Sequence, residues 1–233
     1  MSAPETNAKL PPAFEPRLDI LPPAQLRLWP ELADTPDEFT LYGGTAIALR
    51  LGHRTSVDFD FFANDPFTPN ALLQNIRYLK GATVRRSEPN TLTVTVERGG
   101  PVQVSFFGDL GLGQVEPSGK ASGPGIKLAS LVDLAGCKVA VVTQRAEARD
   151  YVDVHALLKR ANIPLGKMLA AARIIYGTQF NPMLSLKALS YHDDRTLADL
   201  SAEIRRDLIA AVRAVDPQHL PMLAAVRKRA DTR

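Results

Sequence analysis

The chain has 233 residues, of which 45% are hydrophobic and 23% are charged. These are the values of an ordinary globular protein, long enough for one large domain or two small ones, and they exclude a chain that is disordered throughout. The single cysteine, Cys137, excludes a disulfide framework and a cysteine-built zinc site within one chain. The formal net charge of +3 is too small for a dedicated DNA-binding protein.

No apolar run approaches the roughly 18 residues that a membrane-spanning helix needs. The first residues, MSAPETNAKLPPAFEP, also lack the apolar core of a signal peptide. Together with the low cysteine content, this favours a reduced, cytoplasmic setting and predicts no membrane partner.

The first half of the chain changes in composition at about residue 35. Residues 1–35 are rich in proline, which lacks a backbone N–H, so this segment predicts an arm with one short helix at 24–28. Residues 36–115 predict a compact α/β core. Its expected elements are a helix at 45–51 that ends at Gly52, a strand at 56–62, a helix at 70–79, and three strands at 82–86, 91–97 and 102–107.

Residues 108–125 contain six glycines and two prolines, which indicates a loop or hinge and a candidate domain boundary. Residues 116–233 predict a helical domain. Its expected helices lie at 129–142, 147–159, 165–176, 184–190, 197–215 and 220–229. The predicted fold class is therefore α/β (or α+β), with a small mixed sheet followed by a helical C-terminal half.

The most informative stretch is the Gly43-Gly44 turn, separated by thirteen residues from Asp58-Phe59-Asp60. On a strand, the two acids point to the same face, about 7 Å apart. Like charges this close raise each other's pKa, so folding tolerates them best with a cation between them. Mg²⁺ takes carboxylate oxygens and keeps positions open for phosphate oxygens, while a glycine turn before a helix leaves backbone N–H groups that suit a phosphate. The combination indicates nucleotidyl or phosphoryl transfer.

Other interpretations of the acidic stretch are weaker. Two acids on an exposed strand are commonly only solvated. Here the apolar neighbours of the pair predict one buried strand face, made by Val57, Phe59, Phe61 and Phe62. An EF-hand calcium loop fails, because Phe62 stands where an oxygen ligand is required. A P-loop is absent, because Ala121 follows Gly119-Lys120 and Gln114 stands at the position of the first glycine.

Residues 43–62 read G-G-T-A-x-A-L-R-x-G-H-R-x-S-x-D-x-D-F-F, a pattern that resembles the AbiEii/AbiGii nucleotidyltransferase toxin family, a branch of the polymerase-beta-like superfamily. A second match lies in the helical half, where this family has a lysine, four residues, a serine or threonine, one residue and an arginine. Here these are Lys138, Thr143 and Arg145, and residues 149–153 resemble the family's next motif. The resemblance spans about residues 40–160.

The resemblance implies transfer of a nucleoside monophosphate from a nucleoside triphosphate to an acceptor hydroxyl, with Mg²⁺ or Mn²⁺. It implies tRNA, another RNA or a protein as the acceptor, and the toxin of a type IV-like toxin–antitoxin pair, with a cognate antitoxin as partner. The helical domain would then complete the active site. The expected catalytic residues are Asp58, Asp60, Lys138 and Asp153, with Asp58 and Asp60 as metal ligands. The expected nucleotide-binding residues are Gly43, Gly44, Thr45, Ser56, Thr143, Arg145 and Asp150.

The spacing of the second motif has a physical interpretation. Lys138 and Arg145 are seven residues apart, so they share a helical face if one helix runs through both. Thr143 would then point about 140° away from Lys138, so either the helix ends near Thr143 or this residue has another task. The alternative is a surface helix with solvated basic residues. For Asp150 and Asp153, the alternative to a functional role is an ion pair with Arg149 or Lys159.

One feature of the superfamily is missing. A third carboxylate normally lies on the strand next to the acid pair, but the expected strand offers Gln103 and Ser105. The base for the attacking hydroxyl would then be Asp150, Asp153 or Glu97, and we favour Asp153. The other alternative is a catalytically impaired nucleotide-binding or regulatory module on the same fold. A small-molecule transferase of the aminoglycoside-modifying kind is a weaker third hypothesis.

Overall fold

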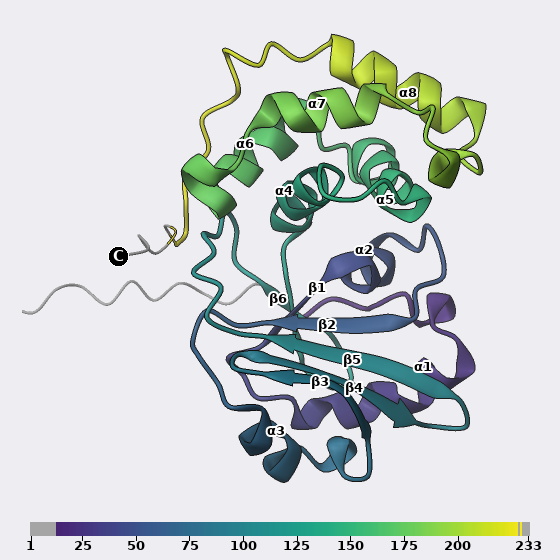
Figure 1. Ribbon diagram of the computed structural model, residues 1–233, viewed down its shortest axis with the longest axis vertical. Helices are drawn as coiled ribbons and strands as arrows, with labels where there is room; N and C mark the ends of the chain where they lie inside the picture. Colours follow the sequence, from purple (N-terminus) through teal and green to yellow (C-terminus); the bar gives the residue numbers. More distant parts are fainter. Residues whose placement is uncertain (1–12, 228, 230–233) are drawn as a thin grey trace, which may run out of the picture.

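The computed structural model describes residues 13–227 and 229. Figure 1 shows a sheet through the middle of the molecule, with α2, α4 and α5 on one side and α1 and α3 on the other. Helices α6, α7 and α8 form a further layer beyond α4 and α5 (Figure 1). Residues 1–12 of the expected N-terminal arm lie outside the described residues.

A seven-stranded mixed sheet forms the centre, in the order β3-β4-β5-β2-β1-β7-β6. The pairs β2–β5 and β1–β7 are parallel, and the other neighbours are antiparallel. The mixed α/β class predicted from the sequence is confirmed. The strands are β1 Thr40–Tyr42, β2 Asp58–Phe62, β3 Thr83–Glu88, β4 Thr91–Glu97, β5 Pro101–Phe107, β6 Gly119–Lys120 and β7 Lys127–Leu128.

Eight α-helices and five short 3₁₀ helices complete the described part of the chain. The α-helices are α1 Pro23–Leu28, α2 Gly43–Leu51, α3 Pro69–Asn75, α4 Leu131–Val141, α5 Ala148–Lys159, α6 Leu165–Tyr176, α7 Pro182–Ser190 and α8 Ala202–Arg213. The 3₁₀ helices are η1 Leu18–Ile20, η2 Trp29–Asp34, η3 Arg77–Leu79, η4 Gly177–Gln179 and η5 Arg195–Leu197.

The acid-bearing strand follows the predicted alternation but is shorter than expected. Phe59 and Phe61 are fully buried, while the two aspartates on the other face are only half-buried. The strand begins at Asp58, so Ser56 and Val57 precede it. Val57 is 44% exposed, so the expectation that it shares the buried face was wrong. Apolar burial sets the register of β2 and thereby fixes where the acids point.

Three other boundaries differ from the prediction. Helix α2 begins at Gly43, so both glycines belong to its first turn, and it ends as expected at Gly52, which has a left-handed φ of 60°. The expected helix at 70–79 is divided into α3 and η3, because Ile76 adopts an extended backbone. The expected helix at 197–215 is also divided, since Ser201 caps a new helix by accepting from the N–H of Ile204.

The helical half is otherwise close to expectation, except at its end. Residues 220–227 form no helix, so the expected helix at 220–229 was wrong for this described stretch, and residue 228 lies outside the description. Instead, Arg227 pairs with Gln114 through the backbone. The sheet also continues beyond residue 115, because β6 and β7 join its edge. A division into units at residues 35 and 115 stays a prediction.

The packing of α4 on α6 places the helical layer against the sheet. Gly136 lies at their contact, where an added Cβ would be 2.8 Å from Ile175 Cδ1 and 2.9 Å from the Ala172 nitrogen. The missing side chain therefore allows the two helices to approach closely. Within the described residues, no helix is long and apolar enough to cross a membrane.

Candidate active site

The two glycines at the start of α2 leave room for polar side chains. Gly43 has a φ of +72°, and an added Cβ would lie 2.8 Å from Asp60 Oδ2. An added Cβ on Gly44 would collide with the guanidinium of Arg54 and lie 3.3 Å from Asp153 Oδ2. No side chain caps this helix, so its first backbone N–H groups keep the capacity to bind an anion.

The acid pair is held by its neighbours in the sheet. Asp60 stands opposite Tyr42 on β1 and Ser105 on β5, and Asp58 stands opposite Gln103 on β5. The adjacent strand expected from the sequence is therefore confirmed as β5, and it carries no acid beside the pair. Thr45 binds the start of β2 to α2, because its hydroxyl lies 2.7 Å from Ser56 Oγ and also contacts the Asp58 carbonyl oxygen.

The ionised form of Asp60 is electrostatically destabilised in the folded protein. Burial raises its pKa, and the charge of Asp58 raises it further, while Lys138 opposes both effects. A raised carboxylate pKa means that the ionised form is poorly stabilised by the protein alone. Ionised Asp60 would therefore gain from a cation bound beside it.

Lys138 projects from α4, whose start is fixed by a capping network. Ser130 accepts from the N–H of Asp133 at 3.0 Å, and the buried Asp133 carboxylate accepts from the N–H of Val115 at 2.8 Å and from that of Glu116 at 3.0 Å. These bonds anchor the loop after the sheet to the helix. Two turns later, Lys138 is only 6% exposed.

The acids of α5 bind Lys138 directly. Its Nζ lies 2.8 Å from Asp150 Oδ1 and 2.9 Å from Asp153 Oδ2. Arg145 also donates to Asp150, with Nε 2.8 Å from Oδ2. Burial alone would raise the pKa of Asp150, but the charges and hydrogen bonds of Lys138 and Arg145 outweigh it and lower that pKa. Asp150 thus holds both cations on one side of the site.

Asp153 has still more partners, from the loop before β2. His53 Nε2 lies 2.6 Å from Oδ1, and Arg54 forms a bidentate pair with Nε–Oδ1 at 2.7 Å and Nη2–Oδ2 at 2.9 Å. Burial alone would raise the pKa of Asp153, but these bonds and the Lys138 charge hold it well below its usual range. Asp153 is fully buried.

This geometry bears on two expectations. The expectation that Asp153 acts as the base does not fit a buried carboxylate whose oxygens are taken by His53, Arg54 and Lys138. Of the two alternatives for the second motif, the structure has the helix that ends near Thr143, because α4 ends at Val141, so Lys138 and Arg145 do not share a helical face. They meet instead through Asp150. The partners of the α5 acids are therefore neither Arg149 nor Lys159.

Two cavities adjoin the acid pair. The first, of about 200 Å³, is strongly polar and carries acids, cations and hydroxyls. It is lined by Gly44, Thr45, Arg54, Thr55, Ser56, Val57, Asp58, Asp60, Gln103, Lys138, Arg145, Arg149 and Asp150. The second, of about 420 Å³, is largely apolar. It is lined by Tyr42, Gly43, Gly44, Ile47, Asp60, Phe62, Phe107, Leu134, Cys137, Lys138, Val141, Gln144, Arg145 and Tyr176.

The two cavities share four residues, namely Gly44, Asp60, Lys138 and Arg145. The apolar cavity contains aromatic rings at the ends of the strands, where Tyr42 and Phe62 stack with ring centres 4.8 Å apart. One site can therefore take a ligand with a charged part on one side of Asp60 and a planar apolar part on the other.

The structure brings together most of the residues that the sequence singled out. Thr143 is an exception, because its hydroxyl donates to the Ala140 carbonyl and it lines neither cavity. Ser56 lines the polar cavity and is buried beside Thr45. The sequence indicates no site role for the aromatic residues, and its pattern predicts Phe62 on the buried face of the strand. The parity of β2 places Phe62 on the acid face.

A magnesium ion fits this donor set. Within the described residues, no cluster of three or more His, Cys, Asp or Glu is arranged for a metal. Asp58 and Asp60 nevertheless share a strand face, and Asp60 has a raised pKa and a glycine beside its Oδ2. Mg²⁺ is commonly held by one or two carboxylates, with the remaining positions taken by water and substrate phosphates.

Comparison with known proteins agrees with this geometry. Residues 27–228 match a family described as the nucleotidyl transferase AbiEii toxin of a type IV toxin–antitoxin system. An uncharacterised protein of Aquifex aeolicus is 28% identical over 160 residues, which is 68% of this chain and 75% of that protein.

Two solved structures share the fold. MenT4, a nucleotidyltransferase toxin of Mycobacterium tuberculosis, is 17% identical with a TM-score of 0.53, over 84% of each chain. An antigenic nucleotidyltransferase-like protein of Paracoccidioides brasiliensis is 16% identical with a TM-score of 0.51, over 86% of this chain and 94% of that one.

Proposed function

Because the chain belongs to the AbiEii family of nucleotidyltransferase toxins, we propose that it moves a nucleoside monophosphate from a nucleoside triphosphate to an acceptor hydroxyl, with Mg²⁺ or Mn²⁺. One observation carries the proposal. The polar and apolar cavities meet over Asp60, Lys138 and Arg145, which suits a molecule with a triphosphate at one end and a base at the other.

The polar cavity would hold the triphosphate. Asp58 and Asp60 would hold the metal, which when bound neutralises phosphate charge and orients the reacting phosphate. Arg145 would bind phosphate oxygens as a fork and Lys138 as a point charge. The backbone N–H groups of Gly43 and Gly44 would add hydrogen-bond donors, and these residues have no side chain that would obstruct the phosphate. Ser56 offers a further hydroxyl in the same cavity.

The aromatic cavity would hold the nucleobase. Tyr42, Phe62, Phe107 and Tyr176 supply flat apolar surface, on which any base can stack. Gln144 lies on the same lining and carries an amide that can donate to and accept from a base edge.

In the reaction, the acceptor oxygen would attack the α-phosphorus in line. A new P–O bond forms as the bond to the β-phosphate oxygen breaks, and pyrophosphate leaves while the hydroxyl proton passes to solvent. Such transfers depend chiefly on positioning and charge stabilisation, so the lack of an acid on β5 does not preclude catalysis. Asp150 and Asp153 would act as positioning residues that orient Lys138 and Arg145.

The family description supports further parts of the proposal. A type IV toxin–antitoxin system implies an antitoxin that opposes this chain. An RNA, such as tRNA, is the acceptor that we favour over a protein, because Arg54, Arg145 and Arg149 line the polar cavity and favour an approaching polyanion.

A catalytically impaired nucleotide-binding module is the second candidate. Its supporting observation is the pair of neutral residues, Gln103 and Ser105, opposite the acid pair. Such a module would bind nucleotide and metal but would not turn them over.

Transfer of label separates the two functions. The protein is incubated with each of the four α-labelled nucleoside triphosphates, Mg²⁺ and total cellular RNA or protein. We expect label on RNA with the wild-type chain, and a loss of at least about 100-fold in Asp58→Asn, since even outer-shell changes at metal sites cost 10- to 100-fold. Asp199→Asn is the matched control, because Asp199 is exposed and lines neither cavity.

Label transfer that Asp58→Asn leaves unchanged would contradict the assignment. If no label is transferred, calorimetry with a nonhydrolysable nucleotide and Mg²⁺ distinguishes the second candidate. Binding that Asp58→Asn weakens, without transfer, would establish the impaired module in place of the enzyme.

A further inference from the structure

The sheet continues beyond the acid pair as an open polar face. Strand pairing places Asp58 opposite Gln103 on β5, and Gln103 opposite Thr95 on β4. In the next row, Asp60 stands opposite Ser105, and Ser105 opposite Thr93. Residues that are opposite in a sheet share a face. Two parallel rows of uncharged polar side chains therefore lead away from the acids.

A bulge in β3 brings an arginine to each row, although the residue directly opposite Thr95 is Thr83. The register shifts between Val84 and Arg86, so Arg85 is the extra residue. Regular alternation would put Arg85 and Arg86 on opposite faces. With the bulge, Arg86 stands opposite Thr93, and Arg85 Nε lies 2.9 Å from Thr95 Oγ1. Both guanidinium groups thus share the face of Asp58 and Asp60.

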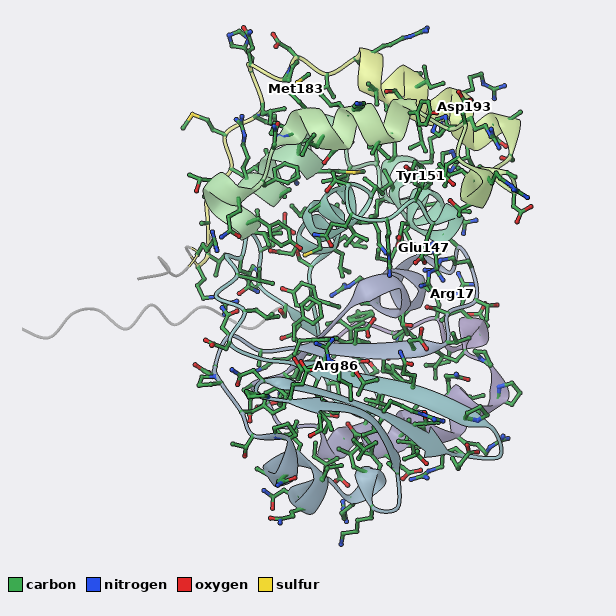
Figure 2. All side chains as sticks on the ribbon, viewed as in Figure 1. Arg17, Arg86, Glu147, Tyr151, Met183 and Asp193 are labelled. Carbon is green, nitrogen blue, oxygen red and sulfur yellow. The ribbon has the colours of Figure 1, made fainter. Side chains whose placement is uncertain are left out.

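This face is accessible except at Ser105, which is only 3% exposed. Every residue of β3 is exposed, Gln103 is exposed, and Thr93 and Thr95 are half-buried. The opposite face of these strands is apolar and packed, with Val94 and Val104 fully buried. Arg86 is labelled among the strands in Figure 2, below Glu147 at the start of α5. Four adjacent strands span about 14 Å, at about 4.8 Å between neighbours.

The charges on this face favour a polyanion close to the site. Among the described residues, Arg85 is bound only to a neutral hydroxyl, that of Thr95. Arg86 pairs with Glu88 at 2.7 Å, but both side chains are 56% exposed, and such surface pairs are weak and easily exchanged. Glu97 is the other acid on this face, and it lies at the far end of β4, opposite Pro101. Gln103 and Ser105 carry no charge that would repel a phosphate.

We propose that this face is the docking track for the single-stranded end of a polynucleotide acceptor, with Arg85 and Arg86 binding backbone phosphates while the terminal hydroxyl reaches the acid pair. The inference rests on the proposed function, because it assigns the acceptor of that same site. Recognition would be largely independent of sequence, since the two rows offer hydroxyls and cations to the backbone, and the aromatic rings of Phe62 and Phe107 lie in a separate row.

The test measures RNA binding without nucleotide, so it does not depend on turnover. A fluorescent single-stranded RNA of mixed sequence is titrated with the wild-type chain and with Arg85→Ala/Arg86→Ala, over a range of salt concentrations. We expect about tenfold weaker binding in the double variant at low salt. The slope of log K against log salt should become shallower by about 1.4, at about 0.7 per lost phosphate contact on a single strand.

Two further variants sharpen the result. Arg77→Ala is the matched control, because Arg77 is also an exposed arginine paired to an acid, Asp34, but it belongs to η3. It should leave binding and salt slope unchanged. Glu88→Gln should tighten binding, because it releases Arg86 and removes a negative charge from the track. In transfer assays, the double variant should raise KM for RNA and leave KM for the nucleotide unchanged.

Several outcomes would overturn the proposal. These are no RNA binding by the wild-type chain, equal losses in the double variant and Arg77→Ala, or a salt slope that the double variant does not change. Slower labelling of a protein acceptor with unchanged RNA binding would identify the face as a protein-binding surface instead. Arginine-dependent RNA binding without any transfer would support the track, while the failure would belong to the proposed function alone.

Discussion

The molecule contains two pairs of aspartates near Lys138, and they differ in their partners. Asp58 and Asp60 lie on β2 without an ion pair among the described residues, and the pKa of Asp60 is raised. Asp150 and Asp153 lie on α5, bound by a lysine, arginines and a histidine, and their pKa values are lowered. The same side chain thus lacks an ion-pair partner among the described residues in one pair and is a fixed structural anion in the other.

The difference shows that partners, rather than residue type, decide the role of a carboxylate. A carboxylate whose charge is already matched gains little from a metal and accepts protons poorly. A carboxylate close to a like charge is stabilised both by binding a metal and by accepting a proton. This contrast predicts opposite responses of the two pairs to loss of charge.

The largest effect is expected at Asp153. Asp153→Asn should lower the free energy of unfolding by about 3–5 kcal/mol, because Lys138 and Arg54 would keep buried charge without their partner. Urea denaturation at pH 7 measures this loss. Asp199→Asn is the control, since Asp199 is exposed, and it should change the free energy by less than about 0.5 kcal/mol.

The same variant has a defined pH dependence. The folded-state pKa of Asp153 is lowered, so its contribution is fully present above the unfolded value of about 3.9 and is lost as the pH falls through the folded value. The gap between wild type and Asp153→Asn should therefore narrow below about pH 4. A difference in unfolding free energy that stays constant down to pH 2 would contradict the conclusion that Asp153 is ionised in the folded protein.

At Asp60, thermal stability and transfer rate should change in opposite directions. Its folded-state pKa is raised, so the ionised group costs stability above that value. Without metal at pH 7, Asp60→Asn should unfold at a higher temperature than wild type while losing at least about 100-fold in transfer rate. Saturating Mg²⁺ should raise the Tm of the wild type and not that of the variant. A less stable, still active Asp60→Asn would refute the contrast.

Gly44→Ala tests the link between the two pairs. The added Cβ collides with Arg54, which binds Asp153, so we expect a cost of about 1–3 kcal/mol from overpacking. Arg54→Lys replaces the forked guanidinium that packs on Gly44. In the Arg54→Lys variant, Gly44→Ala should therefore lower the free energy of unfolding by less. A double-mutant cycle from thermal unfolding measures this coupling, and additive effects would show that the contact does not matter.

The smallest effect is expected at Thr143. Its hydroxyl satisfies the Ala140 carbonyl at the end of α4, and it lines neither cavity. Thr143→Ala should change the free energy of unfolding by less than about 0.5 kcal/mol and the transfer rate by less than about twofold. A large loss of transfer would restore the nucleotide-binding role that the motif indicated.

The sequence predicted the local features of this site well. The alternation of Asp58 to Phe61, the end of α2 at Gly52 and the strand carrying Gln103 all follow from periodicity and turn chemistry, which act within a few residues. Residues 220–227 were less predictable, because a backbone pair between Gln114 and Arg227 overrides their helical pattern.

The part that could not be predicted depends on contacts between distant segments. Nothing near Gly44 in the sequence indicates that a guanidinium packs on it, and nothing near Asp153 indicates a histidine and an arginine from the loop before β2. The aromatic cavity also forms only when the ends of β1, β2 and β5 meet Tyr176 of α6. Helical spacing suggested that Lys138 and Arg145 share a face, but Asp150 joins them across a loop instead.

The contact between His53 and Asp153 joins positions 100 residues apart in the chain. During synthesis, the acidic strand emerges from the ribosome well before the helix that orders its cations. A nascent polypeptide that has not yet reached α5 therefore carries the acid pair without the carboxylates that hold Lys138 in place. Translation order would thus delay the completion of this site until the chain has been made as far as Asp153.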